Sequence, residues 1–338
     1  MQNNTKEIDW PLAIGPVTAR NRVFLAPLSG ISDLPFRQLA WRYGAGLVIT
    51  EMVASRELVT ERRESRVRLR GDGIDPHVVQ LAGREADWMA EAARIAEAEG
   101  AAMIDINMGC PAKKVTGGYS GSALMRDPDH ALSLIEATVN AVSVPVTLKM
   151  RLGWDHENLN APAIAARAEA AGIQMITIHG RTRMQFYEGV ADWDAIASIR
   201  DAVRVPLVAN GDVNSRADID ECLRRSGADA VMIGRASRGQ PWICGILAGS
   251  TDAPKPGPQR NAIALEHYTM MIDHYGEDVG VRHARKHIGW YLDTLAPSAP
   301  KRLKGALMTA RTAAEALPLF SEALETGADT AANLESAA

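Results

Sequence analysis

The chain has 338 residues, of which 46% are hydrophobic, and a formal net charge of −4. This length allows one large core and a smaller module, and the charge argues against a surface coated with Lys and Arg for bulk nucleic-acid binding. The three cysteines, Cys110, Cys222 and Cys244, form no CxxC pair, so neither a disulfide framework nor a zinc cluster is supported. Because no apolar run approaches ~20 residues and the first residues lack an export signal, we expect a cytoplasmic protein that binds neither membrane nor metal.

Apolar, strand-like runs recur along the chain, with helix-like stretches between most of them. Gly44, Gly100, Gly172 and Gly227 each close a helical pattern just before such a run, as left-handed helix terminators do. The runs are nearly all apolar, which is typical of buried parallel strands. Strands are expected within residues 23–27, 43–52, 77–82, 99–107, 145–150, 171–179, 205–210 and 226–234. This alternation predicts an α/β fold, a (β/α)8 TIM barrel.

A proline-rich stretch separates the barrel from the C-terminal part. Residues 251–260 hold three prolines and a glycine, which predicts a linker. Beyond it, Val281, Ala284, Ile288 and Tyr291 fall on one helical face with Leu295, so we expect a small helical bundle. The predicted organisation is a barrel domain over 1–250, the linker 251–260, a helical domain over 261–324 and a disordered tail over 325–338.

Basic residues gather in two places in this acidic chain. Residues 56–70 hold six Arg against three Glu, and residues 255–311 hold nine Lys or Arg against five Asp or Glu. Arg282 and Lys286 fall outside the apolar helical face and give the bundle a basic outer side. His283 and His287 share a helix face, but no carboxylate or thiol accompanies them, so packing or RNA contact is favoured over a metal site.

Most of the apolar runs end in residues able to bind a ligand. In (β/α)8 barrels the active site forms at the carboxyl ends of the strands, so these residues are candidates for function. They are Pro27, Leu28, Ser29, Gln80, Asn107, Cys110, Lys149, Arg151, His179, Arg181, Asn210, Gly211, Asp212, Gly234 and Arg235. All are expected to converge on one mouth of the barrel.

Two of these candidates, Cys110 and Lys149, need a particular explanation. Cys110 lies at a strand end before the glycine-containing loop KKVTGGYSGSAL, which suggests a thiol that exchanges a proton with a substrate, although free Cys is often simply buried. Lys149 lies within PVTLKMR and needs an anionic partner, which a buried salt bridge or a functional site would supply equally well. His179 alone would more often be a core histidine, but its neighbours Arg181 and Arg183 favour function.

The segments NGDVNS and GRAS, at the ends of the last two strands, place glycines before helix starts. Backbone N–H groups and a helix dipole can face an anion there, which suggests a phosphate site unless the glycines only form tight turns. The chain contains no GxGxxG, P-loop, HExxH or GxSxG, so dinucleotide, triphosphate, zinc-protease and serine-hydrolase functions lose support.

Several segments together resemble one known family. The likeness lies in APLSGISDLPFR, TEM, QLAG, DINMGCPAKKV, GSAL, TLKMRLGW, TIHGRTRMQFYEGVADW, ANGD, GADAVMIGRASRGQPW and, in the helical module, ARKHIGWYL. With these motifs the chain resembles the bacterial tRNA-dihydrouridine synthases, and among them the DusB branch. It departs from the family in having PLSG for PMAG and GGYSG for a basic pair, neither of which concerns the central chemistry.

The resemblance implies a flavin enzyme. Bound FMN, reduced by NADPH, would reduce the C5–C6 double bond of a uridine in the tRNA D-loop, with hydride passing from flavin N5 to C6 and a proton from Cys110, as general acid, to C5. Lys149 would supply positive charge at the N1–C2=O edge of the flavin. The other flavin contacts implied are Pro27, Leu28 and Ser29 through the backbone, Gln80, His179, Asn210, Gly211, Asp212, Gly234 and Arg235.

The resemblance also implies how the RNA is held. Asn107, Arg151 and His179 would line the uracil side, and the uridine would leave its stack to reach the flavin. Further RNA contacts implied are Lys113, Lys114, Arg181 and Arg183 near the mouth, and Arg282, Arg285 and Lys286 in the helical domain. We expect the protein to act as a monomer.

Two other functions stay open. One is an FMN barrel of the dihydroorotate- or dihydropyrimidine-dehydrogenase type, which acts on a free pyrimidine and has no need of a basic helical domain. The other is an RNA-binding or regulatory protein whose barrel has lost redox function, which would stay colourless after FMN is added.

Overall fold

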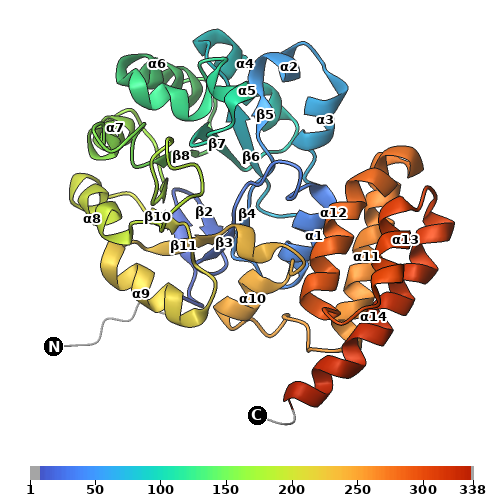
Figure 1. Cartoon of the computed structure of the whole chain (residues 1–338). Coiled ribbons are helices and arrows are strands. Elements are labelled where there is room, and N and C mark those ends of the chain that lie inside the picture. The colour runs from blue at the N-terminus through green and yellow to red at the C-terminus, as the bar shows by residue number, and fades with distance from the viewer. Residues whose placement is uncertain (1–7, 336–338) are drawn as a thin grey trace.

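The computed structural model describes residues 8–335, with side chains for residues 8–327. Within this part of the chain, nine strands form one parallel sheet in the order β4-β3-β11-β10-β9-β8-β7-β6-β5. The strands are β3 Val23–Leu25, β4 Leu47–Val48, β5 Val53–Ala54, β6 Val78–Ala82, β7 Met103–Met108, β8 Val146–Arg151, β9 Ile176–His179, β10 Leu207–Asn210 and β11 Ala230–Ile233. A parallel bridge between Ile49 and Val78 closes the sheet into a ring surrounded by helices (Figure 1). The predicted (β/α)8 barrel is confirmed.

The second predicted strand, within residues 43–52, is broken into β4 and β5. Ile49 lies opposite Val78 and Val53 lies opposite Leu81, so one strand advances by four residues where β6 advances by three. Near the extra residue, the Thr50 hydroxyl accepts the hydrogen bond of the Gln80 backbone N–H at 2.9 Å. A bulge of this kind depends on the paired strand, so the local pattern of residues 43–52 could not predict it.

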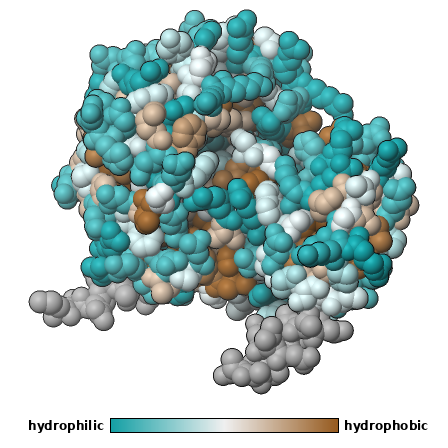
Figure 2. Space-filling view, viewed as in Figure 1, coloured by the Kyte–Doolittle hydropathy of each residue, from teal (hydrophilic) through white to brown (hydrophobic). Residues whose placement is uncertain are grey.

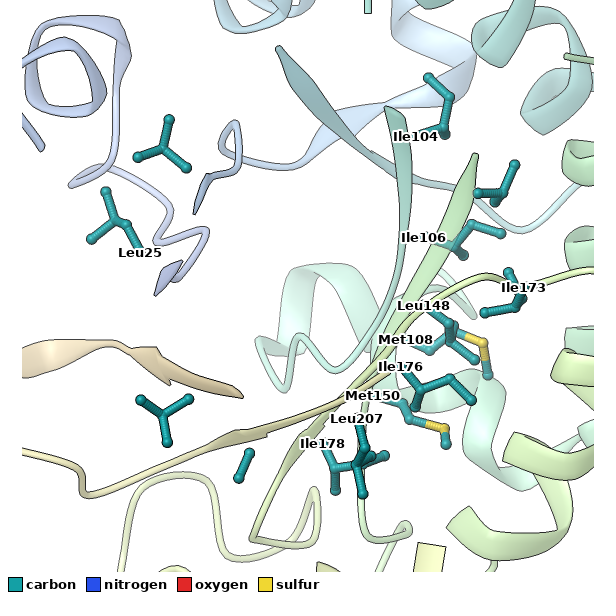
Figure 3. Packing of buried hydrophobic residues seen from close by; sticks show 14 of the residues in the cluster. Leu25, Ile104, Ile106, Met108, Leu148, Met150, Ile173, Ile176, Ile178 and Leu207 are labelled. Atoms are coloured by element: carbon teal, nitrogen blue, oxygen red, sulfur yellow. The ribbon is translucent and has the colours of Figure 1, made fainter. Parts of the chain in front are cut away.

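Side chains along each strand point alternately into the barrel and out toward the helices. The outward layer is apolar: Figure 3 shows Ile104, Ile106 and Met108 of β7 beside Leu148 and Met150 of β8. The inward side chains fall into two levels. An apolar core fills the lower level and includes Phe24, Leu47, Val78, Met103, Met175, Val208 and Met232, closed off by the hairpin β1 (Leu12–Ile14) and β2 (Val17–Ala19). Polar side chains occupy the upper level, at the carboxyl ends of the strands.

The helices of the barrel begin and end at residues suited to those positions. Asp33, Asp127 and Asp192 each accept a backbone hydrogen bond at the start of a helix, and Ser215 and Asp218 form a capping box. As predicted, φ is positive at the four terminating glycines: 100° at Gly44, 91° at Gly100, 106° at Gly172 and 65° at Gly227. The helices are α1 Leu34–Arg42, α2 Ser55–Val59, α3 Arg63–Leu69, α4 Ala86–Ala98, α5 Lys113–Thr116, α6 Pro128–Val139, α7 Ala161–Ala170, α8 Trp193–Ala202, α9 Arg216–Ser226 and α10 Ile243–Ala248, with 3-10 turns η1 Gly121–Arg126 and η2 Arg235–Ser237.

A helical module packs on one side of the barrel (Figure 1). It consists of α11 Pro258–Tyr275, α12 Glu277–Leu295, α13 Lys301–Thr309 and α14 Ala313–Glu335. The predicted face of α12 is buried at Val281, Ala284, Ile288 and Tyr291. The core of the module also contains Leu39 of α1 and Trp242, which precedes α10, both fully buried. The barrel and the module therefore share hydrophobic packing.

Two predicted boundaries differ from the structure. Helix α11 begins at Pro258, within the expected linker 251–260, because proline suits the first turn of a helix. The disordered tail was expected from residue 325, whereas the structure continues α14 as far as Glu335; residues 336–338 lie outside the described residues. Within residues 8–335, no helix is long and apolar enough to cross a membrane. Hydrophilic side chains cover most of the face in Figure 2, and hydrophobic ones show near its centre.

Candidate active site

A cavity of about 830 Å³ opens at the carboxyl ends of the strands. Small-molecule sites commonly measure ~300–1,000 Å³, so it has room for a cofactor and part of a substrate. Every flavin contact expected from the resemblance lines this cavity, and so do Asn107, Cys110 and Arg151. Chain segments far apart in the sequence therefore meet where the pattern of strand ends predicted.

Lys149 lines the cavity from β8 and reaches past β9 to β10. Its amine donates a hydrogen bond to the amide oxygen of Asn210 at 3.1 Å, and the Asn210 amide nitrogen donates to the carbonyl of Met232 at 2.8 Å. The described partner of Lys149 is thus an amide and not the carboxylate of a salt bridge. Burial, with the nearby charge of Arg151, lowers the pKa of Lys149 to about 8, so the amine carries positive charge at neutral pH.

Cys110 lies in a turn two residues beyond β7, and Asn107 holds this turn. The Asn107 side-chain oxygen accepts hydrogen bonds from the backbone N–H groups of Gly109 at 3.2 Å and Cys110 at 3.0 Å. The Cys110 carbonyl accepts from the hydroxyl of Ser122 at 2.9 Å, which ties the turn to η1. The backbone of Cys110 is therefore held from both sides.

The three cysteines differ in burial and acidity. Cys222 and Cys244 are buried, and burial raises the pKa of each thiol to about 12, so both serve as small hydrophobic residues. Cys110 is only half-buried and lies in the cavity. Burial also raises its pKa, while the Ala112 backbone and the charges of Arg151 and Lys149 act in the opposite direction. The Cys110 thiol is consequently protonated at neutral pH, as a proton donor must be.

Arg151 and His179 organise the wall between β8 and β9. Arg151 donates hydrogen bonds to the carbonyls of Gly109 at 2.8 Å, Thr182 at 2.7 Å and Phe186 at 2.9 Å, so it joins the Cys110 turn to the loop after β9. Burial and the neighbouring charge of Arg151 hold the pKa of His179 well below its usual value. A guanidinium of Arg181 lies 3.3 Å from His179 Nε2, and because Arg can only donate, this nitrogen is the acceptor of a neutral ring.

Glycines bring the backbone up to the cavity at the ends of β10 and β11. A Cβ at Gly211, where φ is 118°, would lie 2.8 Å from the Cβ of Ala191, so no other residue fits there. A Cβ at Gly234 would come within 4.0 Å only of Asn210 and would otherwise project into the cavity. With the charge of Lys149, this open backbone fits a flavin that carries a phosphate.

Asp212 organises the same end of the cavity. Its carboxylate forms salt bridges with Arg181 at 2.5 Å and Arg235 at 3.1 Å, and accepts a hydrogen bond from the Ala191 backbone at 2.8 Å. The three groups occupy the carboxylate, and the guanidinium of Arg235, 42% exposed, stays accessible to a ligand in the cavity.

Arg181 and Arg183 do not lie where RNA phosphates could reach them. Arg181 is 1% exposed and its guanidinium also donates to the carbonyls of Glu188 and Gly189. Arg183 is buried, lies over the rings of Trp154 and Phe186, and donates to the Thr116 hydroxyl at 3.4 Å. The prediction that these two arginines contact phosphate is therefore wrong: both hold loops in place around the cavity.

The remaining RNA candidates fall into two groups. Lys113 and Lys114 are exposed on α5, next to the Cys110 turn, and Arg282 is exposed on α12. Arg285 instead donates to the carbonyl of Ala310 at 2.9 Å and links α12 to the end of α13. The amine of Lys286 lies beside Gly30, so close that a Cβ on that glycine would be 3.0 Å away. Since Gly30 follows Ser29 of the cavity wall, Lys286 brings the helical module to the edge of the mouth.

Sequence reasoning missed the aromatic side of the cavity. Phe186 and Tyr187 line it, and the Tyr187 ring lies below the guanidinium groups of Arg235 at 5.1 Å and Arg151 at 5.6 Å. Tyr187 is 48% exposed. In the sequence, the signal for this site was the pair of aromatic residues in MQFYEG, a polar loop that follows a barrel strand. Among the described residues, no group of three or more His, Cys, Asp or Glu side chains could hold a metal ion.

Comparison with known proteins gives one consistent family. The family model described as dihydrouridine synthase (Dus) matches residues 24–329. A probable tRNA-dihydrouridine synthase of Rhizobium leguminosarum bv. phaseoli is 64% identical over 315 residues, which cover 92% of this chain and 98% of the relative. The tRNA-dihydrouridine synthase B of Pseudomonas aeruginosa is 48% identical over 288 residues, 83% of this chain and 87% of the relative.

Solved structures support the fold. Morphinone reductase aligns with a TM-score of 0.54 at 15% identity and covers 77% of this chain and 94% of its own. Histamine dehydrogenase from Rhizobium sp. 4-9 also has a TM-score of 0.54, at 17% identity, over 79% of this chain and 51% of its own. At these identities the likeness concerns the barrel architecture alone.

Proposed function

Because the chain belongs to the dihydrouridine synthase family, we propose that it reduces the C5–C6 double bond of a uridine in the D-loop of a tRNA, with FMN as cofactor and NADPH as reductant. The observation that carries this proposal is the position of the half-buried, protonated Cys110 in the same cavity as the charged Lys149. One group can donate a proton, and the other favours negative charge on a bound ring.

The cavity walls suggest how FMN is held. The backbone at Gly211, Gly234 and Arg235 would receive the ribityl chain and phosphate, and Pro27, Leu28 and Ser29 would contact the ring system through their backbone. Gln80 and Lys149 would bind its polar edge. FMN bound in this way would supply the hydride for uracil C6, and NADPH would replenish it.

The chain's own groups would complete the reduction. The Cys110 thiol would give its proton to C5, while Asn107, Arg151 and the neutral His179 would hold the uracil. Tyr187 would cover the ring, since its aromatic face is half exposed to the cavity. Because Arg151 also holds the Cys110 turn through Gly109, the same residue would place the substrate and the acid.

The helical module suggests how the RNA is held. Arg282 and Lys286 on α12, and Lys113 and Lys114 on α5, lie on elements that flank the mouth and would contact phosphates around a flipped uridine. We propose a barrel that carries catalysis and a module that grips the tRNA, acting as a monomer in the cytoplasm.

The test is a reconstituted reaction. Purified protein with FMN and NADPH should add two hydrogens to one or more D-loop uridines in tRNA that lacks dihydrouridine, detected by mass spectrometry of nuclease fragments. Reduction of free uracil or orotate with no product in tRNA would favour the free-pyrimidine enzyme instead. A protein that binds no FMN, and so stays colourless, would support the non-catalytic alternative.

A further inference from the structure

A chain of side-chain hydrogen bonds begins below the cavity at Asp105. This residue lies in the middle of β7, is 0% exposed, and pairs in register with Gln80 of β6 and Thr147 of β8. One carboxylate oxygen accepts from the Thr147 hydroxyl at 2.6 Å, and the other accepts from the Gln80 amide nitrogen at 2.7 Å. Both oxygens of Asp105 are thus engaged, and Asp105 does not line the cavity itself.

The hydrogen bonds continue from Gln80 to the Cys110 turn. The Gln80 amide oxygen accepts from the Asn107 amide nitrogen at 2.7 Å. The Asn107 amide oxygen in turn accepts from the backbone N–H groups of Gly109 and Cys110. Asp105 and the backbone of Cys110 are therefore connected through two amides only.

The Asp105 carboxylate at one end of this series of hydrogen bonds and the Cys110 backbone N–H at the other fix the direction of the Gln80 and Asn107 amides. A carboxylate accepts hydrogen bonds and a backbone N–H donates them. An amide turned the other way would place oxygen against oxygen or nitrogen against nitrogen at both of its contacts. Gln80 and Asn107 consequently each have one orientation, with the nitrogen directed toward Asp105 and the oxygen directed toward Cys110.

We propose that Asp105 is a positioning residue, which sets the orientation of the Gln80 and Asn107 amides and through them holds the Cys110 turn. Each amide nitrogen has a second hydrogen beyond the one used in the chain, and both residues line the cavity. Gln80 and Asn107 therefore offer hydrogen-bond donors to the cavity. We expect the edge of a ligand that faces them to carry acceptor atoms. The inference rests on the proposed function only for the identity of that ligand.

The test measures how fast iodoacetamide alkylates each cysteine of the purified full-length protein, with the modified peptides quantified by mass spectrometry. Asp105→Leu removes the acceptor that orients Gln80, so Cys110 should react about fivefold faster, the factor that loss of one ordinary hydrogen bond represents. Thr147→Val removes the other hydrogen bond of Asp105 and leaves the hydrogen bonds from Asp105 to Cys110 intact. Cys110 of this variant should therefore be alkylated at the unchanged rate.

A merely structural role of Asp105 would give a different result. General loosening of the barrel would expose the buried Cys222 and Cys244 as well, with a lower melting temperature. The proposal is overturned if all three cysteines become reactive together, if Asp105→Leu and Thr147→Val have equal effects, or if Cys110 keeps its rate in Asp105→Leu.

A second pair of variants keeps the test open if Asp105→Leu does not fold. Asp105→Asn should leave the Cys110 rate unchanged, because the new amide can donate to the Thr147 hydroxyl and direct its oxygen at Gln80. Asp105→Ala, which removes the acceptor with a smaller side chain than Leu, should raise the Cys110 rate. An unchanged rate in Asp105→Ala overturns the proposal. All of these readouts are independent of dihydrouridine formation, so they fail or succeed separately from the proposed function.

Discussion

The Lys149 amine and the Asn210 amide oxygen lie 3.1 Å apart and join the carboxyl ends of β8 and β10 over the intervening strand β9. Lys149→Met should weaken FMN binding by about tenfold, because a hydrogen bond from a charged donor contributes ~1.5–3 kcal/mol. Titration of the flavin-free protein with FMN, followed by quenching of flavin fluorescence, measures this affinity. Lys255→Met, at an exposed position outside the cavity, is the matched control. Equal affinities of the two variants would contradict a role of Lys149 in flavin binding.

Lys149 should also affect stability as pH rises. Its pKa is about 8 in the folded protein, lowered chiefly by burial from 10.5. Between these values the unfolded chain binds more protons than the folded one, so the free energy of unfolding rises with pH. In flavin-free protein this gain should reach ~3 kcal/mol at most.

Urea unfolding at about pH 8 and about pH 10 measures this gain. The comparison is with Lys149→Met, which cannot titrate and should show a smaller rise. If both proteins gain the same stability, the pKa of Lys149 is not lowered in the fold.

Cys110→Ala should separate the reduction of FMN by NADPH from the reduction of uridine. NADPH oxidation and FMN binding should persist, while dihydrouridine formation falls by ~10²–10⁴-fold, the usual range for loss of a general acid. Flavin absorbance follows the first step and mass spectrometry of tRNA the second. Cys222→Ala, at a buried position of α9, serves as the control that keeps both steps. Equal product from Cys110→Ala and the unchanged protein would end the proton-donor role.

Charge reversal on α12 should affect the RNA and spare the cofactor. Arg282→Glu combined with Lys286→Glu should raise the KM for tRNA and lower its salt dependence, because fewer counterions are released on binding. The rate of FMN reduction by NADPH should not change. Lys301→Glu, on the exposed start of α13, is a control of equal charge change per site. A KM for tRNA indistinguishable from that of the control would contradict a role of α12 in RNA binding.

The sequence predicted the barrel and the cavity wall because both follow from the order of residues within short segments. Each strand is an apolar run, and the residue that ends it must lie at the same rim as the others. Cys110, Lys149 and Gly234 could be placed in this way without knowledge of their contacts. The bulge at Thr50 could not, because it depends on the register against β6.

The arginines show the limit of such reasoning. Arg181 ends a strand as Arg151 does, so both were expected to face a ligand. The partner of Arg181 is Asp212, which lies 31 positions later and becomes a neighbour only when β9 and β10 pair. Arg183 likewise contacts Thr116, 67 positions earlier. Whether a charged side chain faces the cavity or holds a loop depends on such distant partners.

Leu39 and Trp242 belong to the barrel by sequence, yet both are buried in the core of the helical module. Any rotation of the module would pull these side chains out of their packing and expose apolar surface to water. The spacing between α12 and the mouth is consequently set once, when the chain folds. A tRNA gripped by the module would therefore present its uridine to a mouth at a constant distance from that grip.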